Sequence, residues 1–145
     1  MPKFSNSSKE KLRTVDKGLQ ALFNEVVKHF DCTVTCGLRT TAEQQTLYAQ
    51  GRTMPGPIVT NLDGVTKRSR HQINDQGICT AVDVVPYPID WDGRDRFYHF
   101  AGFVKGMAAQ MGLDVTWGGD WDSDYVLDDQ SFYDFPHFEI RSMTR

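Results

Sequence analysis

The sequence ICTAVDVV at residues 78–85 alternates toward its end and predicts a strand, which Pro86 and Pro88 terminate. Its one charged residue, Asp83, lies inside this apolar stretch. Burying a carboxylate is costly unless the group is paired or bound to a cation. Asp83 is therefore a candidate metal ligand, and a salt bridge is the alternative explanation.

Two further stretches supply imidazoles, since SRH ends at His71 and DFPH ends at His137. Two imidazoles and the Asp83 carboxylate form a zinc shell that leaves a fourth position for water. Asp134 stands three residues before His137, where its carboxylate could take a proton from that water. The sequence contains no HExxH motif, so the ligands must come from separate elements that the fold brings together.

Two segments have the periodicity of amphipathic helices. Apolar residues recur three and four apart over residues 9–30 and predict one long helix that Ser7 or Ser8 caps. Residues 94–111 carry a stripe of Phe, Ala, Val and Met on one face, with Asp92 as the expected cap. Both stripes are interpreted as core-forming faces.

Residues 32–38 alternate in polarity and predict a half-buried strand. Thr40 and Glu43 then form a capping box, which starts a helix that runs to about Gln50. Arg39 therefore lies between a strand end and a helix start, where a side chain is held more rigidly than in an open loop. Its guanidinium either points into the site or is solvated on the surface.

The remaining segments are short strands and loops. Residues 114–117 and 136–140 predict strands, and the second places Glu139 on the same face as the final histidine, where it either orients a ligand or meets solvent. Residues 51–68 form a long loop without a period, a kind of segment that is often functional. The acidic loop 122–129 suggests calcium, but it lacks the glycine and glutamate of an EF-hand loop.

The chain has three cysteines and no CxxC pair. Cys32 and Cys36 are four residues apart in the expected strand, about 13 Å at about 3.3 Å per residue. That separation is too large for a disulfide, so buried free thiols are expected. A disulfide to Cys79 or a cysteine metal ligand are the alternatives.

Composition sets broad limits. The 145 residues are 39% hydrophobic and 24% charged, which predicts one soluble globular domain. A net charge of -3 gives no support for a nucleic-acid partner, and no apolar run is long enough for membrane insertion. The N-terminus lacks the apolar segment of a secretory signal, so we expect synthesis in the cytoplasm, and we expect a monomer.

Five motifs together resemble one peptidase family. They are CGLRT at 36–40, SRH at 69–71, TAVD at 80–83, WGGDW at 117–121 and DFPH at 134–137. In these residues the chain resembles the zinc D-alanyl-D-alanine carboxypeptidases and dipeptidases, and most of all their phage endolysin branch of L-alanyl-D-glutamate peptidases. The similarity runs from about Ser5 to Ile140, with aspartate at 134 where other branches have glutamate.

This resemblance implies an α+β fold, with a small, mostly antiparallel sheet flanked by helices as in the Hedgehog and DD-peptidase group. It implies a single catalytic domain over residues 1–145 without a separate wall-binding module. Its substrate would be the peptidoglycan stem peptide in the periplasmic cell wall, cut between L-alanine and D-glutamate. A lytic enzyme without a signal peptide would need a holin-type membrane pore to reach that substrate.

The resemblance also implies roles for individual residues. One zinc would be held by His71, Asp83 and His137, and Asp134 would act as the base. Arg39 would stabilise the oxyanion. For Ser69 and Asp120, orienting or contacting the substrate and purely local turn roles are equally open. Cleavage of D-alanyl-D-alanine and a non-catalytic zinc-binding domain are the alternative functions.

The interval from His71 to Asp83 departs from the family, because it is longer than usual. We interpret residues 72–79 as an insertion that bulges between two ligands. If this interpretation is wrong, Asp75 is the rival ligand.

Overall fold

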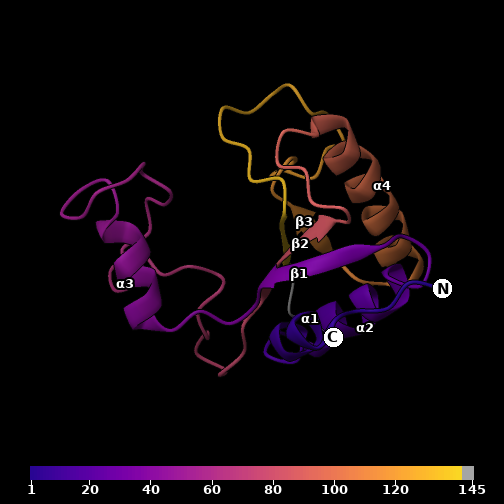
Figure 1. The fold of residues 1–145 in the computed structure, drawn as a ribbon, viewed down its shortest axis with the longest axis horizontal. Helices are drawn as coiled ribbons and strands as arrows, with labels where there is room; N and C mark the ends of the chain where they lie inside the picture. The colour runs from indigo at the N-terminus through magenta and orange to yellow at the C-terminus, as the bar shows by residue number, and fades with distance from the viewer. Residues whose placement is uncertain (142–145) are drawn as a thin grey trace.

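The computed structural model describes residues 1–141, which contain four helices and four strands (Figure 1). In chain order these are α1 (Asn6–Leu12), α2 (Lys17–Val26), β1 (Cys32–Cys36), α3 (Thr41–Ala49), β2 (Ala81–Pro86), α4 (Arg94–Gln110), β3 (Val115–Trp117) and β4 (His137–Ile140). None of the helices described in residues 1–141 has the length and apolar character needed to cross a bilayer.

The strands form one antiparallel sheet in the order β1-β2-β4-β3. The predicted α+β fold with a small antiparallel sheet is therefore confirmed. Strand β2 is central, because it pairs with β1 on one side and β4 on the other. The chain thus places the segment that contains Asp83 at the middle of the sheet.

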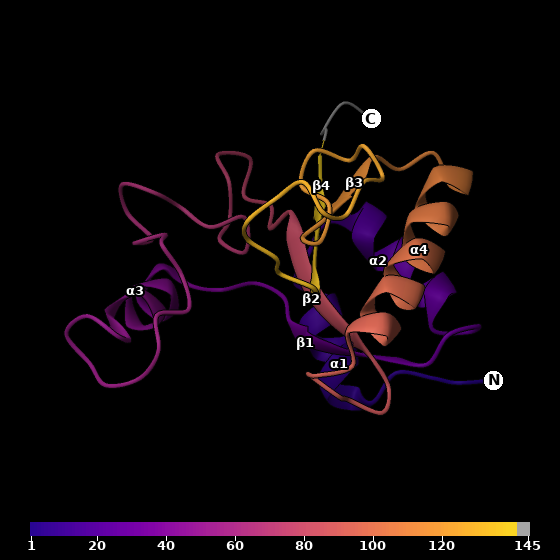
Figure 2. The same cartoon turned by 90° about the horizontal axis from the view of Figure 1, so that it is seen from above.

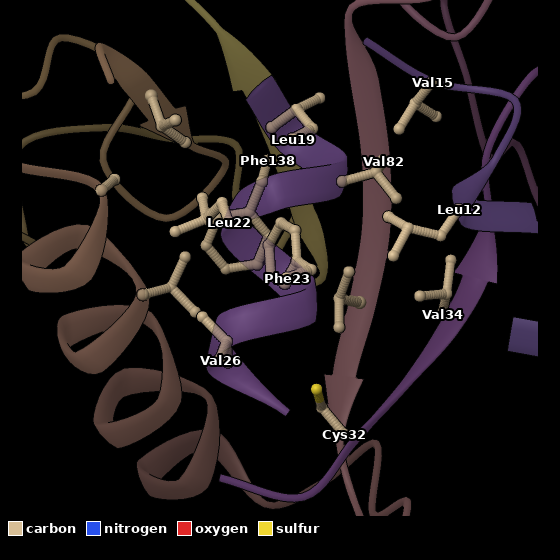
Figure 3. Packing of buried hydrophobic residues seen from close by; sticks show 14 of the residues in the cluster. Leu12, Val15, Leu19, Leu22, Phe23, Val26, Cys32, Val34, Val82 and Phe138 are labelled. Atoms are coloured by element: carbon tan, nitrogen blue, oxygen red, sulfur yellow. The ribbon is translucent and has the colours of Figure 1, made fainter. Parts of the chain in front are cut away.

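One face of the sheet builds the hydrophobic core. Val82 and Val84 of β2 and Phe138 of β4 are fully buried and belong to a cluster with α1, α2 and α4. Figure 3 shows Phe138 and Val82 packed among the side chains of α2 and β1. Because successive strand residues point to opposite faces, Asp83 and His137 lie on the face away from this cluster.

The predicted helix over residues 9–30 is wrong in one respect, because the structure has two helices there. The chain breaks between α1 and α2, where the Asp16 carboxylate accepts from the amides of Gly18 at 2.8 Å and Leu19 at 3.3 Å. An aspartate side chain that accepts from nearby backbone amides favours the start of a helix and disfavours a position inside a continuing helix. Ser5, rather than Ser7 or Ser8, caps α1 by accepting from the Ser8 amide.

The predicted start of α3 is confirmed. Thr40 accepts from the Glu43 amide, and the Glu43 carboxylate accepts from the Thr40 amide, both at 3.1 Å. The predicted cap of α4 is wrong: Gly93 occupies that position and makes no side-chain cap. The Asp92 amide instead donates to Asp90, within the turn that precedes the helix.

Helix α3 and the loop that follows it stand apart from α2 and α4, with the sheet between them (Figures 1 and 2). We call residues 41–68 the α3 lobe. Two buried glutamines hold it together. Gln44 donates to the Leu62 carbonyl at 2.8 Å, and Gln72 donates to the Gly64 carbonyl at 3.0 Å.

Candidate active site

The register of the sheet assembles the centre of the site. Asp83 of β2 is paired directly with His137 of β4, so their side chains are cross-strand neighbours on one face. Cys36, at the end of β1, is the partner of Asp83 on the other side, after a register shift between Val34 and Cys36. Cys36 and His137, which are far from Asp83 in the chain, are thus its neighbours on the two adjacent strands.

His71 reaches the same place from a loop. Its carbonyl accepts from the Arg39 amide at 2.8 Å, which ties the loop to the end of β1. Its Nδ1 donates to the Gly37 carbonyl at 2.9 Å, leaving Nε2 to face the site. A Cβ on Gly37 would lie 2.3 Å from the Lys11 carbonyl oxygen, so only glycine fits in this position.

Both imidazoles contact the same carboxylate oxygen. His71 Nε2 lies 3.2 Å and His137 Nδ1 lies 3.4 Å from Asp83 Oδ1. Four donors about 2.0–2.1 Å from a tetrahedral zinc lie about 3.3 Å from one another. The two distances to Asp83 therefore match two edges of such a shell, and two imidazoles and a carboxylate are donors that zinc accepts.

Among residues 1–141, two groups that share Asp83 have donor atoms mutually within 4.8 Å. One adds Cys36 and His71, and the other adds Asp134 and His137. The two histidines fall in different groups, so their donor atoms lie more than 4.8 Å apart, and one zinc could bind both only after the rings move closer together. Cys36 is thus a rival metal donor, in line with the cysteine ligand that the sequence offered as an alternative.

Charge in the site is balanced around Asp83. Burial alone would lower the pKa of both imidazoles, but the Asp83 carboxylate outweighs it and raises the pKa of His71 to about 10 and of His137 to about 9. Burial would raise the pKa of Asp83, but the two histidines hold it below its usual range. The two protonated imidazoles therefore bring two positive charges to the Asp83 carboxylate. A divalent cation bound there would supply the same charge in their place.

Glu139 fixes the orientation of one imidazole. Its Oε1 lies 2.8 Å from His137 Nε2, so this nitrogen donates and Nδ1 is left for the site. Carboxylates behind a metal-binding histidine orient the ring and raise its basicity. Glu139 also lies 3.6 Å from the Arg70 guanidinium. The sequence left two roles open for Glu139, orienting a ligand or facing solvent, and the geometry matches the first.

Asp134 lies beside the same cluster but is more open. Its Oδ2 is 3.8 Å from His137 Nδ1, and its side chain is about one third exposed to the cleft. Burial and the neighbouring Asp83 charge raise the pKa of Asp134. Its amide donates to the Gly118 carbonyl at 2.9 Å, so the WGGDW segment fixes its backbone.

Arg39 points toward the cluster from the junction of β1 and α3. Its Nη1 donates to Gln44 Oε1 at 2.8 Å, and its Nη2 donates to Cys36 Sγ at 3.4 Å. The guanidinium is half-buried and lines the same cleft as the histidines. The junction thus holds this arginine in the lining of the cleft, beside Cys36.

These side chains form the floor of an open cleft of about 690 Å³. One wall comes from the α3 lobe, with Leu47, Ile58 and Val59. The opposite wall comes from the loop after β3, with Trp121 and Phe132. The cleft therefore has a polar floor and apolar sides, as small-molecule and peptide sites usually do.

The other predicted residues lie at the margin of the cluster. Ser69 lines the cleft, and its hydroxyl accepts from the His71 amide at 3.1 Å. Asp120 is buried and accepts from the amides of Asp124 and Tyr125, which makes it part of a turn. Asp75 is exposed and belongs to none of the donor groups found in residues 1–141.

Sequence reasoning missed three features of the site. Helical periodicity does not distinguish Gln44, which is fully buried and bonded to Arg39. The sequence favours a buried thiol at Cys36, which is only half-buried beside His71. No motif marks Phe132. Cys36 is 35 residues from His71, and Gln44 is 18 residues from Leu62, so sequence neighbours do not reveal these contacts.

The fold and site together define an α+β domain of the DD-peptidase-like class, with histidines and carboxylates on one sheet face. The chain belongs to the phage L-alanyl-D-glutamate peptidase family, whose sequence model matches residues 1–141.

Two relatives support this assignment. The chain is 30% identical over 114 residues to the peptidoglycan L-alanyl-D-glutamate endopeptidase CwlK of Bacillus subtilis, covering 78% of this chain and 62% of CwlK. It therefore spans less than two thirds of that relative. The crystal structure of the Serratia marcescens L-Ala D-Glu endopeptidase ChiX aligns with a TM-score of 0.67 and 27% identity, covering 96% of this chain and 90% of ChiX.

Proposed function

We propose that this protein is a zinc-dependent peptidase that cuts the L-alanyl-D-glutamate bond of the peptidoglycan stem peptide. The observation that carries the proposal is the contact of His71 Nε2 and His137 Nδ1 with one Asp83 oxygen at the floor of a cleft. Family membership and the activities for which CwlK and ChiX are named support the choice of bond.

In this proposal His71, Asp83 and His137 hold the metal. When bound, zinc would polarise the scissile carbonyl and lower the pKa of a water molecule toward 7. The Gly37 carbonyl and the Glu139 carboxylate each accept from the outer nitrogen of one imidazole, so the inner nitrogen of each ring faces Asp83. The chain therefore orients both rings toward one carboxylate, and metal binding would draw them together.

Asp134 is proposed as the general base and acid. Its raised pKa lies closer to neutrality than that of an ordinary aspartate, which favours both taking and returning a proton. It would take the proton of the attacking water and pass it to the leaving amine. Arg39, fixed by Gln44, would place its positive charge beside the oxygen that becomes negative.

Digestion of purified peptidoglycan tests this function, with the fragments identified by mass spectrometry. New N-terminal D-glutamate supports the proposal, whereas release of D-alanine alone would assign D-alanyl-D-alanine cleavage instead. The Asp134→Asn variant is the matched control, because it keeps the three proposed ligands and should release neither product. The chain of 145 residues is used alone, which also tests whether it is a sufficient catalytic domain.

A further inference from the structure

The cleft has an aromatic wall that the proposed chemistry does not use. The rings of Trp121 and Phe132 are stacked with centroids 6.1 Å apart and planes only 8° from parallel. Both residues line the cleft, and the Trp121 ring lies 5.4 Å from the ring of His137. The stack therefore lies beside a proposed ligand and forms part of the lining of the cleft.

Backbone contacts hold this wall in place. The Gln130 side chain accepts from the Trp121 amide at 3.0 Å and donates to the Phe132 carbonyl at 2.8 Å. The Trp121 indole N–H donates to the same Phe132 carbonyl at 3.0 Å. The loop thus holds the Trp121 indole directly and fixes the backbone from which the Phe132 ring projects.

Packing does not account for Phe132. Its ring is 60% exposed, and neither Phe132 nor Trp121 belongs to the core or to the side chains packed against it. A rigid aromatic surface left in water at an active site favours a ligand with a flat apolar face. The C–H face of a pyranose ring is such a surface, and it carries no charge.

The distances match the chemistry of the proposed substrate. In peptidoglycan the L-alanine is joined through a lactyl group to an amino sugar of the glycan strand. L-Alanine and the lactyl group together span about two residue lengths, roughly 7 Å from the scissile carbonyl to the sugar. The aromatic rings lie at comparable distances, since the ring centroid of Trp121 is 5.4 Å from that of His137 and the centroid of Phe132 is 6.1 Å from that of Trp121.

We propose that Trp121 and Phe132 form a sugar subsite that binds the glycan ring nearest to the scissile bond. This inference rests on the proposed function and adds a second determinant of specificity to it. The enzyme then recognises a glycopeptide rather than a free peptide. Phe132 is the residue to test, because Trp121 also contacts the ring of the ligand His137.

The test compares two substrates that share one stem peptide: one carries the lactyl-linked sugar and the other an N-terminal acetyl group. For Phe132→Ala, kcat/KM on the sugar-bearing substrate should fall about tenfold, the factor expected when roughly 55 Å² of apolar contact is lost. On the acetylated peptide kcat/KM should not change. Phe132→Trp, which keeps an aromatic ring at this position, should keep the preference for the sugar-bearing substrate. Tyr125 is an exposed aromatic residue on the same loop but outside the cleft, so Tyr125→Ala should alter neither value.

Binding gives a readout that does not need turnover. Calorimetry with Asp134→Asn should show about tenfold weaker binding of the sugar-bearing peptide when Phe132→Ala is added. Equal losses on both substrates, or no loss on either, would overturn the sugar subsite while leaving the proposed peptidase intact. A wild-type enzyme that cuts neither substrate would overturn the proposed function itself.

Discussion

Truncation of Gln44 should separate the positioning of Arg39 from the binding of the metal. The Gln44 side chain is fully buried, accepts from Arg39 Nη1 at 2.8 Å, and donates to the Leu62 carbonyl at 2.8 Å and to Thr60 Oγ1 at 3.3 Å. One carboxamide therefore joins the guanidinium of the site to the loop that forms the cleft wall. Gln44→Ala removes all three bonds and leaves the proposed zinc ligands unchanged.

The size of the effect follows from these contacts. A buried carbonyl that loses its donor costs about 1–3 kcal/mol, and a hydrogen bond from a charged group contributes about 1.5–3 kcal/mol. Arg39 is half-buried, so water recovers part of its loss. We therefore expect the free energy of unfolding to fall by about 2–4 kcal/mol. Because deleting an oxyanion donor outright costs about 100- to 1,000-fold, a misplaced Arg39 should lower kcat about tenfold.

The assays are urea unfolding, zinc content after desalting, and kcat on the stem peptide. Gln45→Ala is the matched control, because the neighbouring glutamine of α3 is exposed and should tolerate truncation within about 0.5 kcal/mol. Gln44→Glu refines the test, since a carboxylate still accepts from Arg39 but no longer donates to Leu62. It should keep more of kcat than Gln44→Ala does. If Gln44→Ala behaves like Gln45→Ala, or if it loses zinc, the reasoning is refuted.

Four further results are expected. His71→Ala should lower zinc from one per chain to near zero by atomic emission after desalting, and full zinc content would contradict its role. Asp134→Asn should retain zinc but lose at least 100-fold in kcat, so near-normal turnover would exclude it as the base. In Gly118→Ala the new Cβ would lie 2.1 Å from the Asp134 carbonyl oxygen. The free energy of unfolding should therefore fall by about 1–3 kcal/mol, and kcat should fall as well. An unchanged denaturation curve would contradict this expectation. With pKa values of about 10 and 9, His71 and His137 both carry protons near neutrality and must release them to bind metal. Zinc affinity measured by chelator competition between about pH 6 and 8 should therefore rise about 100-fold per pH unit, whereas a tenfold rise would indicate one histidine ligand.

Local patterns predicted most of the elements. The capping box at Thr40 depends only on residues three apart, and it marks the start of α3 correctly. The alternation in β2 and β4 predicted which residues share a face. The break at Asp16 was missed because the apolar period continues across it, while the carboxylate favours a new helix start.

The arrangement of the site was less accessible from sequence. Alternation placed Asp83 and His137 in strands, but the register that pairs them depends on the whole sheet. The cost of burying Asp83 and the presence of two imidazoles made these residues candidate ligands, and the resemblance to a family supported the same choice. Gln44 and Phe132 follow no motif, because their roles arise from contacts between the α3 lobe, the cleft and the loop after β3.

The central claim is that His71, Asp83 and His137 hold one zinc ion, and X-ray absorption at the zinc edge tests it most directly. The claim predicts two imidazole nitrogens at about 2.0–2.1 Å with oxygen donors completing the shell, and the loss of one imidazole in His137→Ala. A sulfur donor at about 2.3 Å would instead assign Cys36, His71 and Asp83 as the binding group and contradict the claim.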